Sequence, residues 1–174
     1  MKTNPHGSGY TLEKVYVAEQ QYRIIPGVEL SESPASEDRN VDFGWDWRPV
    51  SSRRFEVVIE VNVAPSASAP EQMSVRLMGV FKAEDGPLSI AFTDFLQGNA
   101  PAILFPFARE VISTMSGRGP YGAFHLNPLN VRALLSDFDI SQTTGVEFLN
   151  SRPDLAADFG LDIPKTALPS APAI

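Results

Sequence analysis

The sequence predicts an α+β fold, in which a four-stranded antiparallel sheet is covered on one face by a long and a short C-terminal helix. Two patterns predict it. Apolar residues alternate with a period of two in the first half of the chain, and they follow a helical spacing between residues 99 and 135. The two patterns are segregated along the chain. Segregated strands and helices are typical of an antiparallel sheet, because parallel strands need a crossover, usually a helix, between them.

Three segments have the composition of strands, and these strands are expected at 10–25, 53–64 and 72–83. A fourth segment, 88–93, is expected to be either a short strand or the start of the helical region. Residues 55–63 give the clearest alternation, which predicts one buried face. The alternation of the first strand slips between Leu12 and Val15, so a β-bulge is expected near Glu13 and Lys14.

A long connection from Pro26 to Pro49 follows the first predicted strand, and it becomes aromatic toward its end. Phe43, Trp45 and Trp47 alternate there, so an extended backbone would point all three to one side. Two interpretations stay open. The aromatic side chains form a lid that packs on the core, or they form a wall that binds apolar segments of other polypeptides, and both can hold at once.

The long helix is predicted over 101–116, after the start signal of Asn99, and Gly117 ends it. A second, short helix is expected to begin at Asn127. Apolar residues spread around more than one side of the long helix. One side is therefore expected to cover its own sheet and another to cover a sister subunit in a dimer or tetramer. The residues expected at this interface are Phe105, Phe107, Val111, Ile112 and Met115.

The chain is long enough for one domain with a substantial core and too short for two. We expect a flexible arm over residues 1–9, where turn-forming residues are frequent, and the folded domain over 10–149. Residues 150–174 are rich in Ala, Asp and Pro. They are expected to form a mobile tail with at most one helical turn after Pro153.

Charge and composition exclude several classes of function. A net charge of −7 argues against a nucleic-acid partner, because such proteins need a basic surface. The absence of cysteine removes disulfides, thiolate metal ligands and cysteine nucleophiles. The N-terminal residues contain no apolar signal sequence, and no apolar run is long enough to insert in a membrane, so a cytoplasmic location is expected.

Catalytic and metal-binding patterns are equally sparse. His6 and His125 are the two histidines, and no nucleophile-elbow motif accompanies them. The stretch from Asp137 to Ser141 imitates the start of a calcium-binding loop, but Phe148 stands where the bidentate glutamate belongs. The sequence therefore predicts a protein that is not an enzyme and that holds neither a metal nor a cofactor.

The residues of the helical region are more informative than its periodicity alone. It contains ILFPFARE, MSGRG, HLNPLNV and ALL, and in these residues it closely resembles the C-terminal half of the SecB family of protein-export chaperones. The stretches FEVVIEVNV and MSVRLMGVF resemble the second and third strands of that family. The resemblance implies an ATP-independent, tetrameric holdase that binds unfolded or precursor polypeptides in a hydrophobic groove. It nominates as client-binding residues Phe43, Trp45, Trp47, Phe124, Leu126, Leu129, Leu134 and Leu135.

The family delivers its clients to the SecA motor, which docks on an acidic patch of the exposed sheet face. Of the matching positions, Glu19 keeps the negative charge, whereas Arg23 reverses it and Ser74 removes it. Weak or absent SecA binding is therefore expected. Two functions remain open: a holdase for many precursors in protein export, and a dedicated partner of a single client, for example in a toxin–antitoxin system, without delivery to SecA.

Overall fold

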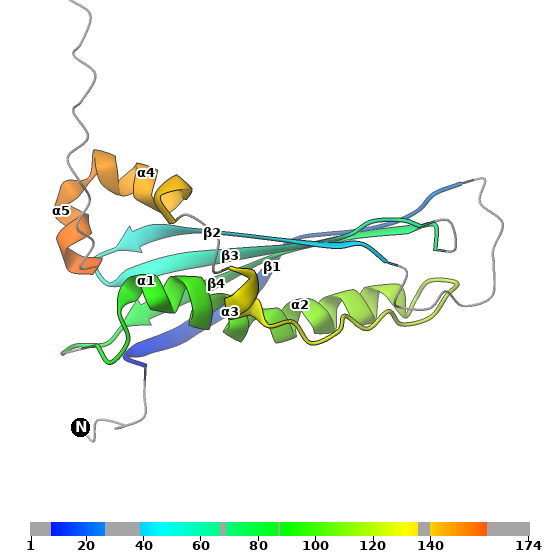
Figure 1. The fold of residues 1–174 in the computed structure, drawn as a ribbon, viewed down its shortest axis with the longest axis horizontal. Coiled ribbons are helices and arrows are strands. Elements are labelled where there is room, and N and C mark those ends of the chain that lie inside the picture. Colours follow the sequence, from blue (N-terminus) through cyan, green and yellow to red (C-terminus); the bar gives the residue numbers. More distant parts are fainter. Residues whose placement is uncertain (1–7, 27–38, 67–68, 87, 136–139, 160–174) are drawn as a thin grey trace, which may run out of the picture.

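The computed structural model describes residues 8–26, 39–66, 69–86, 88–135 and 140–159. In that part of the chain, a long helix lies along one face of a four-stranded antiparallel sheet (Figure 1). The strands are β1 (Tyr10–Ile24), β2 (Val41–Ser51), β3 (Arg54–Val63) and β4 (Glu71–Ala83). Their order across the sheet is β1-β4-β3-β2, so β1 and β2 are its two edges. The predicted fold class is confirmed.

One of the four strands is not the one that the sequence predicted. The aromatic segment assigned to a connection is strand β2, which pairs with β3 in an antiparallel register that places Trp45 opposite Ile59. Segment 88–93 is not a strand. It is the start of the helical region, the other of the two alternatives, and Phe92 is its first helical residue. The alternation of large aromatic residues along β2 fits a pleated surface once β3 supplies a partner.

The pairing of β1 with β4 is irregular. A register shift between Leu12 and Lys14 confirms the predicted bulge, and a second shift lies between Val17 and Glu19. Each shift changes which side chains of β1 face the helix, because the side-chain period of a strand is two. The edge formed by β1 is therefore interrupted twice.

Helices α1 (Phe92–Asp94), η2 (Phe95–Asn99, a π-helix) and α2 (Ala100–Ser116) follow one another without a break. The expectation that Asn99 starts the helix is wrong, because Asn99 is itself helical and makes no capping hydrogen bond through its side chain. Pro101 has no N–H to donate to the preceding turn, and a π-helix is one way to accommodate such an interruption. Gly117 ends the helix as predicted.

The chain after α2 contains more structure than expected. Helix α3 (Val131–Leu134) begins four residues later than predicted, and the Asn130 side chain before it accepts a hydrogen bond from the backbone N–H of Ala133 at 3.1 Å. It is followed by η3 (Ile140–Gln142), α4 (Thr144–Ser151), α5 (Pro153–Ala156) and η4 (Ala157–Phe159). Leu149 and Phe159 are buried in the core. The domain boundary predicted at 149 is therefore too early. The rest of the predicted tail, 160–174, and most of the predicted arm lie outside the described residues.

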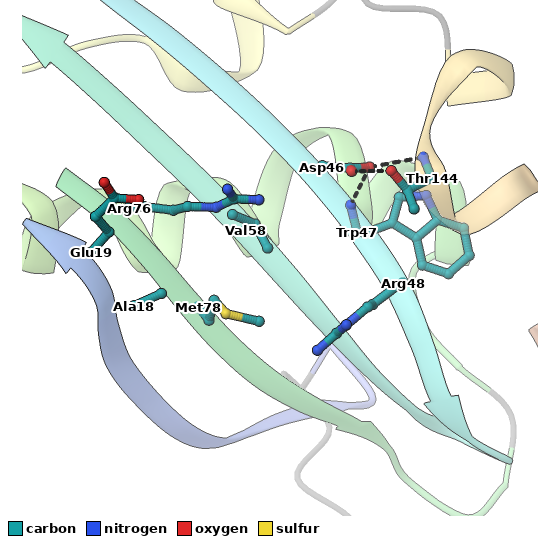
Figure 2. Close-up of a pocket in the computed structure, with 9 residues that line it drawn as sticks. All are labelled: Ala18, Glu19, Asp46, Trp47, Arg48, Val58, Arg76, Met78 and Thr144. Carbon is teal, nitrogen blue, oxygen red and sulfur yellow. Dashed lines mark hydrogen bonds between the residues drawn. The ribbon is translucent and has the colours of Figure 1, made fainter. Parts of the chain in front are cut away.

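The two faces of the sheet differ in chemistry. On the face turned away from α2, charged side chains such as Glu19, Arg48 and Arg76 surround a shallow hollow of about 430 Å³ (Figure 2). Val58 and Met78 also line it. Arg48 pairs with Glu56 at 2.6 Å, but the arginine is more than half exposed, so the pair contributes little to stability.

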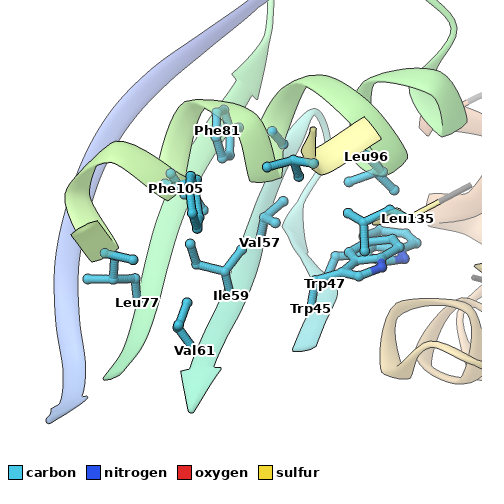
Figure 3. Packing of buried hydrophobic residues seen from close by; sticks show 14 of the residues in the cluster. Trp45, Trp47, Val57, Ile59, Val61, Leu77, Phe81, Leu96, Phe105 and Leu135 are labelled. Atoms are coloured by element: carbon cyan, nitrogen blue, oxygen red, sulfur yellow. The ribbon is translucent and has the colours of Figure 1, made fainter. Parts of the chain in front are cut away.

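The opposite face of the sheet carries the core. Phe55, near the beginning of β3, is stacked on Phe81 with 5.6 Å between the ring centroids and lies edge-on to Phe92 at 4.9 Å. Side chains of β3 and β4 fill the space next to the long helix (Figure 3). Gly79 permits the close approach of this helix, because a Cβ at that position would lie 2.6 Å from Leu104 Cδ2. The core thus joins the sheet to α1, η2 and α2.

Candidate functional site

The aromatic residues of β2 all lie on the face of the strand that is turned toward the helices, as their alternation predicted. Their burial increases along the strand. Phe43 is half-buried, Trp45 is 8% exposed and Trp47 is 1% exposed. The two interpretations of this segment therefore apply to different residues of it.

Trp47 belongs to the core. Its Nε1 donates a hydrogen bond to Thr143 Oγ1 at 2.9 Å, and its ring lies edge-on to Phe92 at 5.1 Å and to Phe159 at 6.2 Å. A Cβ added to Gly145 would overlap the indole ring. These contacts come from both ends of the helical region, so they fix Trp47 as a lid residue.

Phe43 keeps part of its ring exposed, and Trp45 lacks a hydrogen-bond partner for its indole N–H among the described residues. The ring of Phe43 contacts Phe105 of α2 edge-on, with 6.1 Å between the centroids. The indole N–H of Trp45 is buried, and within the described part of the chain it has no hydrogen-bond partner. The beginning of β2 therefore keeps apolar surface and an unused donor.

The other nominated residues divide in the same way. Phe124, Leu126 and Leu135 are buried, whereas Leu129 and Leu134 are 41% and 43% exposed. The burial of the first group has a local cause. The backbone N–H of Phe124 donates to Ser116 Oγ at 2.7 Å, and Arg109 Nε donates to the carbonyl of Leu126 at 2.9 Å. These bonds hold the segment after α2 against the helix, so its apolar side chains pack into the core.

A buried polar cluster, which the sequence analysis missed, joins β1, β4 and the residues that precede β2. Arg39 Nη2 lies 2.6 Å from Glu71 Oε2, and both side chains are almost fully buried. The Tyr22 hydroxyl donates to the other oxygen of Glu71, and the Arg39 guanidinium lies 4.6 Å from the centre of the Phe124 ring. Burial, followed by the hydrogen bond to Glu71, raises the pKa of Tyr22. No local sequence pattern identifies such a cluster.

The three positions of the predicted SecA-facing patch lie on the outer face of the sheet, and the register gives each a neighbour. Arg23 is opposite Gln72, and Glu19 is opposite Arg76. Ser74 pairs with Gln21 between them. The lone acidic position of the predicted patch thus stands beside a basic residue (Figure 2).

The long helix has two apolar sides, but the predicted interface set needs a correction. Phe105 and Ile112 are 5% and 0% exposed because they pack into the core of their own chain, so they are not available to a sister subunit. Phe107 points outward and is 43% exposed. The outward side of α2, as the term is used below, consists of Ile103, Phe107, Val111 and Met115.

Elsewhere in the described ranges, polar groups do not assemble into a reactive centre. His125 Nδ1 lies 3.2 Å from Ser113 Oγ at an exposed position. Among the described residues, no group of three His, Asp or Glu side chains could hold a metal ion. Asp137 to Asp139, the start of the calcium-loop imitation, lie outside the described residues. None of the described helices has the length and apolarity needed to cross a bilayer.

Comparison with known sequences gives a consistent result. A sequence model of the family described as "preprotein translocase subunit SecB" matches residues 5–140. The protein-export protein SecB of Acidithiobacillus ferrooxidans is 30% identical over 139 residues, which cover 76% of this chain and 91% of that protein. The protein-export protein SecB of Actinobacillus succinogenes is 27% identical over 127 residues, covering 71% and 76% respectively.

Comparison with solved structures supports the fold. The SecB-like chaperone of Mycobacterium tuberculosis, solved with a peptide from an antitoxin, superimposes with a TM-score of 0.53. The two sequences are 14% identical, and the superposition covers 69% of this chain and 87% of that one. At this identity, the similarity is evidence of a shared architecture.

Proposed function

This chain belongs to the SecB family, and from that premise we propose that it is an ATP-independent holdase that binds non-native polypeptides for protein export. The observation that carries the proposal is the apolar surface of Phe43, Leu129 and Leu134, which the chain leaves partly or largely exposed. Strand β2, which bears Phe43, rests on the helical run through the contact of Phe43 with Phe105. Helix α3, which bears Leu134 and follows Leu129, packs on η2 and α2 of the same run.

Apolar surface suits a client site that must accept many sequences. Burial of apolar area is favourable by about 25 cal/mol per Å² and has no directional requirement. Such a surface therefore binds unfolded segments by composition instead of by one fixed sequence. The nominated residues Trp47, Leu126 and Leu135 are buried, so they are not part of this exposed surface.

The proposed binding surface can be tested with a permanently unfolded probe, such as reduced and carboxymethylated α-lactalbumin. Phe43→Ala should raise the Kd by roughly 5- to 30-fold, about 1–2 kcal/mol, as expected for an aromatic anchor. Phe148→Ala is the matched control, because Phe148 is an exposed phenylalanine on α4. Unchanged binding by the Phe43 variant, or equal weakening in both variants, would remove Phe43 from the client site.

We further propose that the chain is a dimer or tetramer through the outward side of α2. An exposed aromatic and an exposed isoleucine on one helix face favour burial against a sister subunit. Light scattering at micromolar concentration should give two or four times the chain mass of 19.0 kDa. Phe107→Asp should lower that mass and Phe148→Asp should not. A monodisperse monomer of the unmodified chain would contradict the assembly.

Binding to SecA is proposed to be weak. Arg76 lies opposite Glu19, and Arg23 lies four residues farther along β1 on the same outer face, so a basic docking segment would meet like charge there. Arg23→Glu combined with Ser74→Glu should strengthen SecA binding, measured by titration at two salt concentrations. Tight, salt-sensitive binding by the unmodified chain would show that the contact is made elsewhere.

The altered charge of this patch supports a second candidate, a dedicated partner of one client that acts without delivery to SecA. The two candidates differ in breadth. A holdase should bind several unrelated unfolded proteins with similar Kd values, whereas a dedicated partner should bind one of them far more tightly. A panel of unrelated unfolded probes, titrated under one set of conditions, separates the two.

A further inference from the structure

One buried carboxylate ties together four segments of the chain. Glu71, the first residue of β4, is fully buried, and each of its carboxylate oxygens accepts a hydrogen bond. Arg39, which precedes β2, donates to one oxygen from Nη2 at 2.6 Å, and the Tyr22 hydroxyl of β1 donates to the other. Gly119, in the segment after α2, closes over this contact, because a Cβ there would overlap the Tyr22 hydroxyl and lie 2.9 Å from Glu71 Oε1. Glu71 is therefore the point at which the four segments are joined.

Arg39 also contacts the segment that follows the long helix. Its guanidinium lies 4.6 Å from the centre of the Phe124 ring, within the range of a cation–π interaction. The backbone N–H of Phe124 donates to Oγ of Ser116, the last residue of α2, at 2.7 Å. Arg39 directly precedes Asn40, whose carbonyl accepts the Ala64 N–H at 2.9 Å next to the first pair of β2 and β3. Arg39 thus links the beginning of β2 to β4 on one side and to the end of α2 on the other.

An ion pair is a costly way to fill this part of the interior. Moving two charges out of water is unfavourable, and replacing a buried ion pair with apolar residues of similar volume is often neutral or stabilising. The pair is also incompletely satisfied, because Arg39 Nε and Nη1 are buried and have no hydrogen-bond partner within the described ranges. A partly satisfied buried network is less favourable than an apolar core. What the pair supplies is direction, because a hydrogen-bonded ion pair fixes the relative orientation of its two side chains and apolar contacts do not.

That direction bears on the position of Phe43. Strand β2 is at the edge of the described sheet, where it pairs with β3 alone. Its second half is held by α4, whose first residue, Thr144, donates its backbone N–H to Asp46 Oδ1 at 3.0 Å. Its beginning is held by the ion pair of Arg39 and Glu71. Phe43 lies between these two ties, with its ring packed on α2, so a displacement of Arg39 would change the spacing between Phe43 and α2.

We propose that Arg39 is a positioning residue of the client site. Through its ion pair with Glu71, it holds the beginning of β2 at the spacing from α2 that presents Phe43 to a client. The inference rests on the proposed holdase function and specifies how its binding surface is held in place. The Arg39 side chain is 2% exposed, so it acts through Phe43 and not by contact with the client.

An apolar replacement of the whole cluster separates positioning from stability. The triple variant Arg39→Met, Glu71→Leu and Tyr22→Phe removes both charges and the hydroxyl together, so none of them is left buried without its partner. Its urea midpoint should equal or exceed that of the unmodified chain, whereas its Kd for the unfolded α-lactalbumin probe should rise roughly 3- to 30-fold. Tyr22→Phe alone is the control, because it keeps the ion pair and should keep the Kd. A folded triple variant with an unchanged Kd overturns the proposal.

A conservative variant and a distance measurement decide the question even where the triple variant does not fold. Arg39→Lys retains the charge but loses the planar guanidinium, and with it the fixed direction of the pair. Because the chain contains no cysteine, nitroxide labels can be attached at Asp42→Cys on β2 and Ala102→Cys on α2, both of which are exposed positions. Electron–electron double resonance then measures the distance between the labels. Dilution with unlabelled protein restricts the measurement to distances within one chain.

The distance distribution should broaden or shift in Arg39→Lys, together with a rise in Kd, and should stay unchanged in Tyr22→Phe. The same distribution in all three labelled chains overturns the positioning role. A changed distribution with an unchanged Kd overturns it as well, and leaves the holdase function intact. Failure of the unmodified chain to capture the probe overturns the holdase function and the client-site role of Arg39 with it.

Discussion

The two halves of β2 share the same alternating sequence pattern but lie in different structural environments. In the second half, Trp47 is enclosed by Phe92, Phe159 and the beginning of α4, and its indole N–H and its backbone N–H both have hydrogen-bond partners. In the first half, Phe43 is half-buried and the indole N–H of Trp45 has no hydrogen-bond partner among the described residues. The strand thus has a closed half and an open half.

This difference shows what separates a structural aromatic residue from one that can bind a client. Alternation determines the face of the strand on which a side chain lies. Packing by other elements determines how deeply that side chain is buried. Here residues 140–159 pack over the second half of β2 only. The closed half is expected to contribute stability, and the open half is expected to contribute binding.

The largest effect should come from truncating the closed half. Trp47→Ala should lower the free energy of unfolding by about 3–5 kcal/mol, because a fully buried aromatic side chain leaves a cavity. Phe43→Ala should lower it by less than about 1.5 kcal/mol, because part of that ring is already in contact with water. Urea unfolding followed by circular dichroism measures both. Equal losses would remove the distinction between the halves. Because Trp47 is part of the core, a variant that lacks both Trp45 and Trp47 would lose stability as well as any binding contact, so it cannot measure binding alone.

A smaller effect should follow from crowding the contact between α4 and β2. Gly145→Ala places a Cβ against the Trp47 ring, and overpacking of this kind should cost about 2 kcal/mol. Gly44→Ala is the matched control in the open half, since its Cβ would lie 3.8 Å from that of Glu60, an ordinary contact. That variant should be neutral or slightly stabilising. If both substitutions give the same change in denaturant midpoint, the closed half is more loosely packed than described.

The smallest of these effects concerns the Thr143 hydroxyl, which accepts from the Trp47 indole N–H and donates to the carbonyl of Ile140. Thr143→Val removes both hydrogen bonds and should lower the unfolding free energy by about 1 kcal/mol. Thr143→Ser keeps the hydroxyl and should retain most of that stability. Thermal unfolding compares the two variants with the unmodified chain. A valine variant as stable as the unmodified chain would show that the Thr143 hydroxyl contributes nothing to stability.

Local patterns predicted the parts of the fold whose causes are local. Residues 55–63 alternate without interruption, and Gly117 stops a strongly periodic helix, so both features could be located from the sequence. Strand β2 was missed because Gly44 and Asp46 are unfavourable in strands and a polar connection precedes them. It forms because β3 offers a paired edge, which is a tertiary cause.

The candidate site could be predicted only in part for the same reason. The family resemblance identified which positions belong to the client region, and the structure divides them by depth, with Leu129 and Leu134 exposed but Leu126 and Leu135 buried. That division depends on contacts between segments distant in sequence. The buried pair of Arg39 and Glu71 depends on such contacts as well.

The central claim, that clients contact the open half of β2, can be tested directly by photo-crosslinking. The photoreactive residue p-benzoylphenylalanine would replace Phe43 in one variant and Phe148 in another, and each would be irradiated with the unfolded probe. Both variants must first show native circular dichroism. We predict a covalent adduct with the probe from position 43 and none from position 148. Adducts from position 148, with none from position 43, would contradict the account.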